Sequence, residues 1–284
     1  MSISGSTRML ALLGHPVAHS LSPRIHNAAF TALGLNLVYV AFDIESASLP
    51  YAVRGLQALG SPGANVTVPH KQAVAPLLDR LDGVAAQLRT VNTIVNRGGR
   101  LIGYNTDVEG FIRALRQGFS GSFGDSSFLV LGAGGAGRAV VAALVAESAG
   151  HVVIFNRTEE KARALAKEAL DWIGEDGTSV EAVADQGLPE CMAAADVVVH
   201  TTSVGLQPGL KELPFPVDTL SDSHTVMDLA YDTKPTLFLE HARERGAHLI
   251  PGAHMLLEQA ALSFGLWTGK EAPMAAMKKA LGQV

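Results

Sequence analysis

The strongest limit on how this chain folds comes from four glycines within six residues, Gly132-Ala133-Gly134-Gly135-Ala136-Gly137. An apolar segment precedes them at residues 128–131, an Ala/Val-rich segment follows to about residue 149, and a second apolar segment covers residues 151–155. Glycines at this spacing permit a tight turn, a close backbone approach by a ligand and close packing of a helix on a strand. The segment therefore predicts a strand, a turn, a helix and a second strand, with a helix N-terminus that can receive a pyrophosphate. A close-packed turn that binds no ligand is the alternative.

The residues after the second of these strands indicate which dinucleotide would bind. NAD sites place Asp or Glu there, which accepts a hydrogen bond from the ribose 2′-hydroxyl. This chain has Asn156-Arg157-Thr158 instead, with Lys161 one turn into the next helix. A guanidinium pairs with a 2′-phosphate and stacks on adenine, whereas a carboxylate would repel the phosphate. The sequence therefore favours NADP over NAD, with a solvated basic residue at a strand end as the alternative.

Short apolar segments alternate with helical segments along the rest of the chain, which predicts an α/β fold with parallel strand pairing. A helix begins between the first two strands, with Ser22 as its N-cap and Pro23 as its first residue. Closing helices are expected at residues 258–265 and 272–281. The remaining strands are expected at residues 9–13, 38–42, 64–68, 197–200, 225–229 and 247–250.

Composition excludes several classes of protein. Hydrophobic residues make up 48% of the 284 residues and charged residues 17%, which excludes a disordered chain. The 22 Lys and Arg against 27 Asp and Glu give a net charge of −5 without a basic block, so no nucleic-acid partner is expected. The single cysteine, Cys191, excludes a disulfide scaffold.

Neither a membrane segment nor a metal site is expected. The apolar run at residues 9–13 is too short for a signal peptide, and no segment has the roughly 20 apolar residues of a membrane helix. His15 and His19 are four residues apart, but Pro16 interrupts them and no cysteine lies nearby. We therefore expect a cytoplasmic protein whose partner is a small-molecule substrate.

The N-terminal half carries polar residues at the ends of its predicted strands. Ser20 and Ser22 present two hydroxyls in the first loop, a suitable clamp for a small carboxylate, although Ser22 could serve only as a cap. Asn65 and Thr67 flank Val66 and so point to one face of a strand. Polar groups on one face of a strand must be satisfied there, by protein or by ligand.

A lysine beside an aspartate can donate a proton to the alkoxide that forms when a hydride reaches a ketone. Lys71 and Asp107 are the candidates for this pair. Their separation in the sequence does not by itself establish that they meet.

Ordered motifs along the whole chain resemble those of the shikimate dehydrogenase family. The resemblance implies the reversible, metal-independent reduction of 3-dehydroshikimate to shikimate with NADPH, on the route to chorismate and the aromatic amino acids. The motifs are His19-Ser20-Leu21-Ser22-Pro23, Asn65-Val66-Thr67-Val68-Pro69-His70-Lys71, Val91-Asn92-Thr93, Asn105-Thr106-Asp107, the glycine run, Asn156-Arg157-Thr158, Thr202-Ser203-Val204-Gly205 and Met255-Leu256-Leu257-Glu258-Gln259-Ala260.

The resemblance implies a role for individual positions. Lys71 and Asp107 match the family's catalytic pair. The positions expected to bind substrate are Ser20, Ser22, Asn65, Thr67, Asn92, Tyr231 and Gln259. The positions expected to bind the cofactor are Gly132, Ala133, Gly134, Gly135, Ala136, Asn156, Arg157, Thr158, Lys161, Leu229 and Gly252.

The resemblance also implies two domains. Residues 1–105 with 253–284 would form a substrate-binding and catalytic α/β domain, and residues 106–252 a Rossmann-type NADP-binding domain. The C-terminal helices would return to the first domain and bring Gln259 to the substrate. A monomer or a homodimer is expected.

Four places depart from the family's pattern. Arg89-Thr90 stands where Gly-Ala is common, and His200-Thr201 replaces a usual Asn-Ala. His254 replaces a small residue, and Lys161 replaces a frequent second arginine, which exchanges a planar fork for a point charge.

Two alternatives follow. One is a quinate/shikimate dehydrogenase with a relaxed substrate or cofactor preference; the paired serines Ser20 and Ser22 favour shikimate over quinate. The other is a non-catalytic NADP-sensing module, which could dispense with Lys71 and Asp107, whereas this chain retains both.

Overall fold

The computed structural model describes residues 3–173, 177–202, 204, 213–230 and 235–282. The chain divides into two compact units, unit 1 of Met1–Gly110 with Leu256–Gln283, and unit 2 of Phe111–Met255. The chain passes from unit 1 to unit 2 after Gly110, within α4 (Asp107–Leu115), whose first residue is hydrogen-bonded to Asn92 of unit 1. The second crossing lies within α9 (Gly252–Thr268).

Unit 1 is built on a six-stranded sheet in the order β2-β1-β3-β5-β6-β4. Strand β1 pairs in parallel with its two neighbours, β2 and β3, which confirms the predicted parallel pairing there. The strands are β1 (Arg8–Gly14), β2 (Leu37–Asp43), β3 (Gly63–Val66), β4 (Arg80–Leu81), β5 (Thr93–Arg97) and β6 (Arg100–Tyr104).

Strands β5 and β6 form an antiparallel hairpin that the sequence prediction did not include. Gly98 and Gly99 make its turn with φ values of 62° and 90°, which glycine adopts without strain. Since β5 also runs antiparallel to β3, the carboxyl ends of β3 and β6 lie at the same edge of the sheet as the start of β5. This edge is where the candidate site forms.

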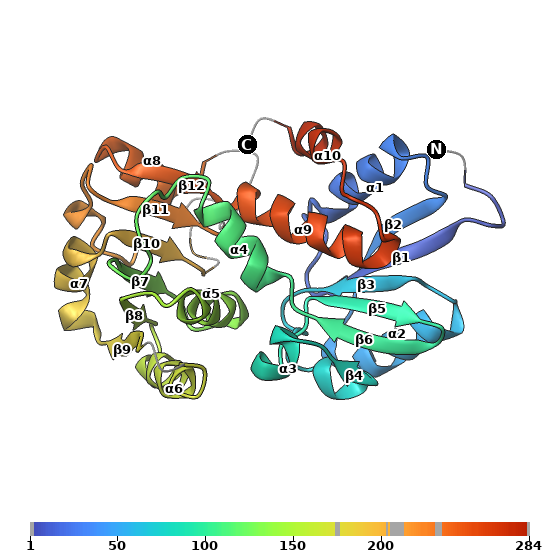
Figure 1. Ribbon diagram of the computed structural model, residues 1–284, viewed down its shortest axis with the longest axis horizontal. Helices are drawn as coiled ribbons and strands as arrows, with labels where there is room; N and C mark the ends of the chain where they lie inside the picture. The colour runs from blue at the N-terminus through green and yellow to red at the C-terminus, as the bar shows by residue number, and fades with distance from the viewer. Residues whose placement is uncertain (1–2, 174–176, 203, 205–212, 231–234, 283–284) are drawn as a thin grey trace. The chain divides into compact units, whose positions relative to one another are not determined.

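The helices of unit 1 cover this mixed sheet (Figure 1). Helix α9 runs beside β5, where Trp267 Nε1 donates to the Ile94 carbonyl at 2.9 Å. The predicted N-cap at Ser22 is wrong, because Ile25 N–H donates to the Leu21 carbonyl and the helix therefore takes Leu21 as its cap. Helices wholly within unit 1 are α1 (Ser22–Ala32), α2 (Leu49–Ala58), α3 (Val84–Leu88) and α10 (Met274–Leu281), with short 3-10 turns at Ser46–Ser48 and Ala75–Leu77.

Unit 2 is built on an all-parallel sheet in the order β12-β11-β10-β7-β8-β9. The chain adds β8 and β9 on one side of β7 and then β10, β11 and β12 on the other, so the strand order reverses between β7 and β10. This is the doubly wound order of dinucleotide-binding domains, so the predicted α/β class is confirmed. Strand β9 was not predicted, and the other strands begin and end within a residue or so of expectation. The strands are β7 (Ser127–Leu131), β8 (His151–Phe155), β9 (Ser179–Val183), β10 (Val197–His200), β11 (Thr225–Asp228) and β12 (His248–Pro251).

Helices follow the strands of unit 2 in the alternation expected of parallel pairing. Because helices cover the sheet, its central strands are continuous apolar runs, such as Phe128 to Leu131 in β7. Among the described residues, no helix is long and apolar enough to cross a membrane. The helices are α5 (Gly135–Ala146), α6 (Glu159–Ala169), α7 (Leu188–Ala194) and α8 (Leu237–Glu244), with 3-10 turns at Asp185–Gly187 and Val217–Thr219.

Candidate active site

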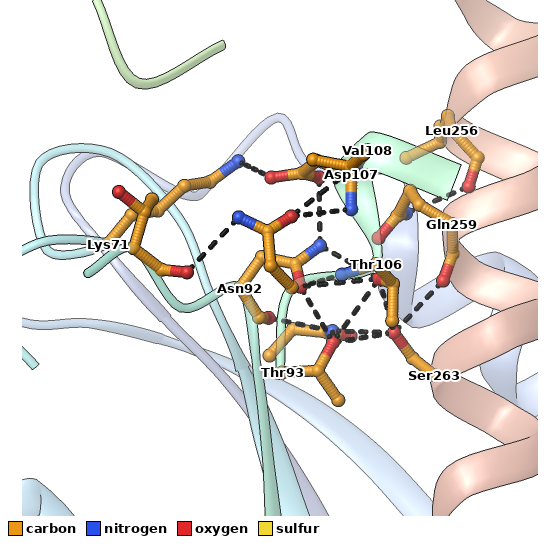
Figure 2. Close-up of polar contacts among 12 residues, drawn as sticks. Lys71, Asn92, Thr93, Thr106, Asp107, Val108, Leu256, Gln259 and Ser263 are labelled. Carbon is orange, nitrogen blue, oxygen red and sulfur yellow. Dashed lines mark hydrogen bonds and ion pairs between the residues drawn. The ribbon is translucent and has the colours of Figure 1, made fainter. Parts of the chain in front are cut away.

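Lys71 and Asp107 meet at the edge of the unit 1 sheet. The Lys71 ammonium lies 2.7 Å from Asp107 Oδ2, and the two side chains are only 17% and 7% exposed (Figure 2). Lys71 follows β3 and Asp107 follows β6, whose carboxyl ends share this edge. The sheet therefore brings together two residues that the sequence keeps 36 positions apart.

Asn92 fixes the other oxygen of Asp107. Its amide nitrogen donates to Asp107 Oδ1 at 2.8 Å and to Thr106 Oγ1 at 2.9 Å, while its carbonyl oxygen accepts from Thr106 N–H at 2.8 Å (Figure 2). The main-chain donor fixes which way the amide points. The carboxylate is thus held by an ammonium on one oxygen and an amide on the other, which sets its orientation.

Buried hydroxyls form a layer beneath this pair, which sequence reasoning missed. Ser263 Oγ lies 2.7 Å from Thr93 Oγ1 and 3.1 Å from Thr106 Oγ1, and it donates to the Gln259 carbonyl at 2.9 Å (Figure 2). Ser263 follows Gln259 by one helical turn on α9, so it shares a face with a predicted site residue. That spacing could have placed Ser263 on the same helix face as Gln259, but it could not have identified the partners of Ser263.

Asn65 stands in the same network. Its oxygen accepts from the Tyr39 hydroxyl at 2.7 Å, and its nitrogen donates to the Asn92 carbonyl and to Thr93 Oγ1, both at 3.0 Å. His26 lies fully buried beside it, with its ring stacked on Tyr39 at a centroid distance of 4.5 Å. Burial lowers the pKa of His26 from 6.5 to about 3, and the neighbouring Asn65 amide opposes part of that shift.

Other predicted substrate residues in the described part of unit 1 lie at or near the same edge. Thr67 comes directly after β3, with its N–H bonded to the Leu13 carbonyl of β1. Ser20 Oγ accepts from the N–H of Ser22 at 3.3 Å, in the loop that follows β1. Among the described residues, no hydrogen bond joins these three side chains to Lys71 or Asp107. Gln259 donates to the Leu256 carbonyl at 2.8 Å, and Tyr231 lies outside the described residues.

The glycine run forms an open cradle at the start of α5. A Cβ on Gly132 would stand 2.5 Å from Thr201 Oγ1, and one on Gly137 would stand 2.0 Å from the Gly132 carbonyl oxygen. These two glycines are therefore required by the protein's own packing. A Cβ on Gly134 would meet nothing within 4 Å, so that glycine faces open space. Open space at the N-cap of a helix fits a pyrophosphate in van der Waals contact with the main chain.

The cationic end of the cradle follows β8. Asn156 accepts from Ala133 N–H at 3.1 Å and donates to the Thr158 carbonyl at 2.9 Å, so it ties the glycine turn to the start of α6. The side chains of Arg157 and Lys161 are exposed and make no hydrogen bond or ion pair with another described residue. Two unpaired cations beside an anion cradle fit a phosphate group.

Leu229 and Gly252 lie at the other half of the unit 2 sheet. Leu229 is half-buried and donates its N–H to the His200 carbonyl at 2.8 Å. A Cβ on Gly252 would stand 2.5 Å from the Asp228 carbonyl oxygen, so the start of α9 packs tightly on the end of β11.

Comparisons with known proteins identify the family of this chain. Family models described as the shikimate dehydrogenase substrate binding domain, shikimate / quinate 5-dehydrogenase and the shikimate 5′-dehydrogenase C-terminal domain match residues 12–94, 114–207 and 252–281. A shikimate dehydrogenase (NADP(+)) of Moorella thermoacetica is 49% identical over 99% of this chain and 95% of its own length. The chain belongs to the shikimate dehydrogenase family.

Solved structures of shikimate dehydrogenases and related enzymes share the fold. That from Aquifex aeolicus superposes with a TM-score of 0.90 at 39% identity, covering 99% of this chain and 100% of its own. A quinate dehydrogenase from Corynebacterium glutamicum in complex with NAD has a TM-score of 0.88 at 34% identity, covering 96% and 98%. The predicted family and fold class are thus confirmed.

One departure from the family's pattern has a structural explanation. Arg89 adopts a left-handed backbone with φ 49° and ψ 36°, the conformation that a glycine would take without strain. The next residue, Thr90, is buried, and its hydroxyl donates to the Leu88 carbonyl at 3.1 Å, which secures the turn. The departure at His200 places a buried imidazole at the end of β10.

Proposed function

We propose that this protein is an NADP-dependent shikimate dehydrogenase, which reversibly reduces 3-dehydroshikimate to shikimate. Membership of the family supports the reaction. The single observation that carries the mechanism is the 2.7 Å contact between Lys71 Nζ and Asp107 Oδ2, in a setting where both side chains are mostly buried.

Lys71 would act as the proton donor of the reduction. The cofactor, when bound, supplies the hydride that adds to the carbonyl carbon, and the carbonyl π electrons move to the oxygen. The Lys71 ammonium then gives its proton to that oxygen, and in the oxidation it takes the proton back. Asp107 orients the ammonium, and Asn92 orients Asp107, so the donor is held in place before the substrate arrives.

The substrate would be held by groups around the same edge. Ser20 and Ser22 offer hydroxyls for its carboxylate, and Thr67 and Gln259 are proposed to contact the ring. Tyr231, which lies outside the described residues, is proposed as a further ring contact on the family resemblance alone. The Asn65 and Asn92 amides are already bonded to protein partners. Their proposed contribution is therefore mainly to position the groups that touch substrate.

The cofactor would lie along unit 2. The residues proposed to hold its pyrophosphate are Gly132, Ala133, Gly134, Gly135 and Ala136, and the open space at Gly134 supports this. Those proposed for the adenosine 2′-phosphate are Asn156, Arg157, Thr158 and Lys161, supported by the two unpaired cations. Leu229 and Gly252 are proposed near the nicotinamide.

Steady-state kinetics on purified protein test the proposal directly. Oxidation of shikimate and of quinate is measured, each with NADP and with NAD. We expect kcat/KM for shikimate with NADP to exceed the other three combinations by at least about 100-fold, as one charged hydrogen bond and one substrate hydroxyl can provide. Binding of NADP without turnover of either acid would instead indicate a sensing module.

The second candidate function is a quinate/shikimate dehydrogenase with a relaxed preference for its substrate or its cofactor. The structural similarity to a quinate dehydrogenase that binds NAD gives it a specific basis. Comparable rates with quinate or with NAD would support it. The cytoplasmic location and the monomeric or dimeric state stay predictions, which fractionation and light scattering address.

A further inference from the structure

A buried imidazole and a buried carboxylate face each other on β10 and β11 of the unit 2 sheet, next to the point between β7 and β10 where the strand order reverses. His200 ends β10 and Asp228 ends β11, at paired positions of adjacent strands. Both side chains are 0% exposed, and His200 Nδ1 lies 2.9 Å from Asp228 Oδ1. The rings of Phe215 and Phe238 flank the imidazole at centroid distances of 5.3 and 5.2 Å.

The other polar atoms of His200 and Asp228 form hydrogen bonds with the chain segments that follow β10 and β11. His200 Nε2 lies 2.6 Å from Thr202 Oγ1, which also accepts from the N–H of Val204 at 3.1 Å. Asp228 accepts from the N–H of Ala230 at 2.9 Å and from the hydroxyl of Thr236 at 2.5 Å. The chain after β10 is thereby joined to the chain after β11.

The hydrogen bonds also assign the tautomer of the imidazole. Since the Asp228 carboxylate has only acceptor oxygens, Nδ1 carries the ring proton and donates to Asp228 Oδ1. Nε2 of the neutral ring then accepts from the Thr202 hydroxyl, whose oxygen accepts from the N–H of Val204. In this arrangement the imidazole orients both the Thr202 hydroxyl and the carboxylate.

The pair stands beside the glycine cradle. Thr201, the next residue after His200, donates its N–H and its hydroxyl to the Leu131 carbonyl at 2.9 and 3.0 Å. In doubly wound sheets one half binds each mononucleotide across the reversal point. The glycine run and Arg157 belong to the half formed by β7, β8 and β9, which leaves the half with His200 for the nicotinamide.

We propose that His200 is a positioning residue for the nicotinamide half of NADP(H), acting through Thr202. The inference rests on the function proposed above. An apolar side chain at this point of β10 would match the three valines before it, yet it would leave Asp228 and Thr202 each short of a partner. The imidazole therefore fixes the geometry of the loops after β10 and β11, a role that an apolar side chain of similar size would not fill.

The test compares two ligands by isothermal titration calorimetry. NADPH spans both halves of the site, whereas adenosine 2′,5′-bisphosphate carries only the adenosine half. His200→Asn restores the residue that is usual in the family at this position. In this chain its amide nitrogen can still donate to Asp228, but the shorter side chain does not reach Thr202, so the variant tests whether this chain depends on the contact with Thr202. We expect the Kd of NADPH to rise about 5- to 30-fold, as for one buried hydrogen bond, while that of the bisphosphate stays within about twofold.

Turnover gives a second readout. Because His200 is placed away from the 2′-phosphate, kcat should fall by the same factor with NADPH and with NADH. An equal rise in Kd for both ligands would mean general damage to unit 2, and no rise for NADPH would mean no role. Either result overturns the proposal.

Thr202→Val removes the same hydrogen bond from the other side and keeps the branched shape of the side chain. It should weaken NADPH by a similar factor, and the double variant should lose no more than either single variant, because both act through one contact. Additive losses would overturn the proposal. Thr202→Val therefore also tests the proposal if His200→Asn does not fold.

Ligand binding by the wild-type protein and by His200→Asn distinguishes a failure of the role of His200 from a failure of the proposed function. Wild-type protein that binds neither ligand refutes NADP dependence, and the role of His200 with it. Wild-type protein that binds both, with His200→Asn unaffected, refutes only the role of His200. In the ligand-free protein, nitrogen-15 NMR should find the His200 proton on Nδ1; a proton on Nε2 alone also overturns the proposal.

Discussion

In unit 1 the candidate site consists of side chains that hold one another, whereas in unit 2 it consists of main chain and unpaired charge. Lys71, Asp107 and Asn92 are linked by hydrogen bonds of 2.7 and 2.8 Å and are mostly buried. In unit 2 the cradle is lined by glycine main chain, and Arg157 and Lys161 are exposed without a described partner.

The difference fits the two tasks proposed for these sites, proton donation in unit 1 and binding of the cofactor in unit 2. A proton donor must be oriented before the reaction, since reorganisation during the reaction raises the barrier. A site for a large anionic ligand gains more from charges that are free, because no ion pair must break when the ligand arrives. Substitutions should therefore change the rate in unit 1 and change affinity or cofactor preference in unit 2.

Lys71→Ala tests the first half of this comparison and should give the largest effect. We expect kcat to fall by roughly 10²–10⁴, the range for a lost general acid–base group, with little change in the Kd of either ligand. Lys278→Ala, an exposed lysine of α10, is the matched control and should keep wild-type kinetics. Near-full kcat in Lys71→Ala would remove Lys71 from the mechanism.

The same comparison explains what could be predicted from sequence. The cradle of unit 2 lies in one contiguous segment with its own strand and helix, so spacing alone located it. The Lys71–Asp107 pair depends on a hairpin that places the ends of β3 and β6 at one edge. Gly98-Gly99 was the available signal for that hairpin. The contacts of Ser263 depend on packing between α9 and β5, which no local pattern specifies.

Substitutions at Gly137 and Gly134 distinguish a glycine needed for packing from a glycine proposed to contact the ligand. Gly137→Ala forces a Cβ against the Gly132 carbonyl and should lower the free energy of unfolding by about 3 kcal/mol. Gly134→Ala adds a methyl group in open space, so the unfolding transition should stay unchanged while the Kd of NADPH rises about tenfold, by close contact with the pyrophosphate. Unchanged NADPH affinity in Gly134→Ala would place the pyrophosphate elsewhere.

Arg157→Ala tests the unpaired charge of unit 2. Loss of a charged hydrogen bond to the 2′-phosphate should raise the KM for NADPH by about 10- to 100-fold and leave the KM for NADH nearly constant. Arg163→Ala on α6 is the control, because its guanidinium pairs with Glu159 instead. Equal effects on the two cofactors would show that Arg157 does not bind the phosphate.

His26 of unit 1 and His200 of unit 2 are both buried, but their ring nitrogens differ in hydrogen bonding. His200 is hydrogen-bonded through both nitrogens, whereas neither nitrogen of His26 has a partner among the described residues. Burial lowers the pKa of His26 to about 3, while the unfolded chain keeps a value near 6.5. Between these two values the unfolded state binds the extra proton, so stability is lost as the pH falls.

The stability lost through His26 should reach about 2 kcal/mol at pH 5 relative to pH 8. Trp267, whose ring lies 5.2 Å from that of His26, reports unfolding of unit 1 by fluorescence once Trp172 of unit 2 is replaced by Phe. Denaturant titrations at the two pH values then give the difference in the free energy of unfolding. In the same background His26→Phe keeps an aromatic ring against Tyr39 and should remove this part of the pH dependence. If the variant and the parent respond equally to pH, His26 is not the group that takes up the proton, and the acid sensitivity of unit 1 has another source.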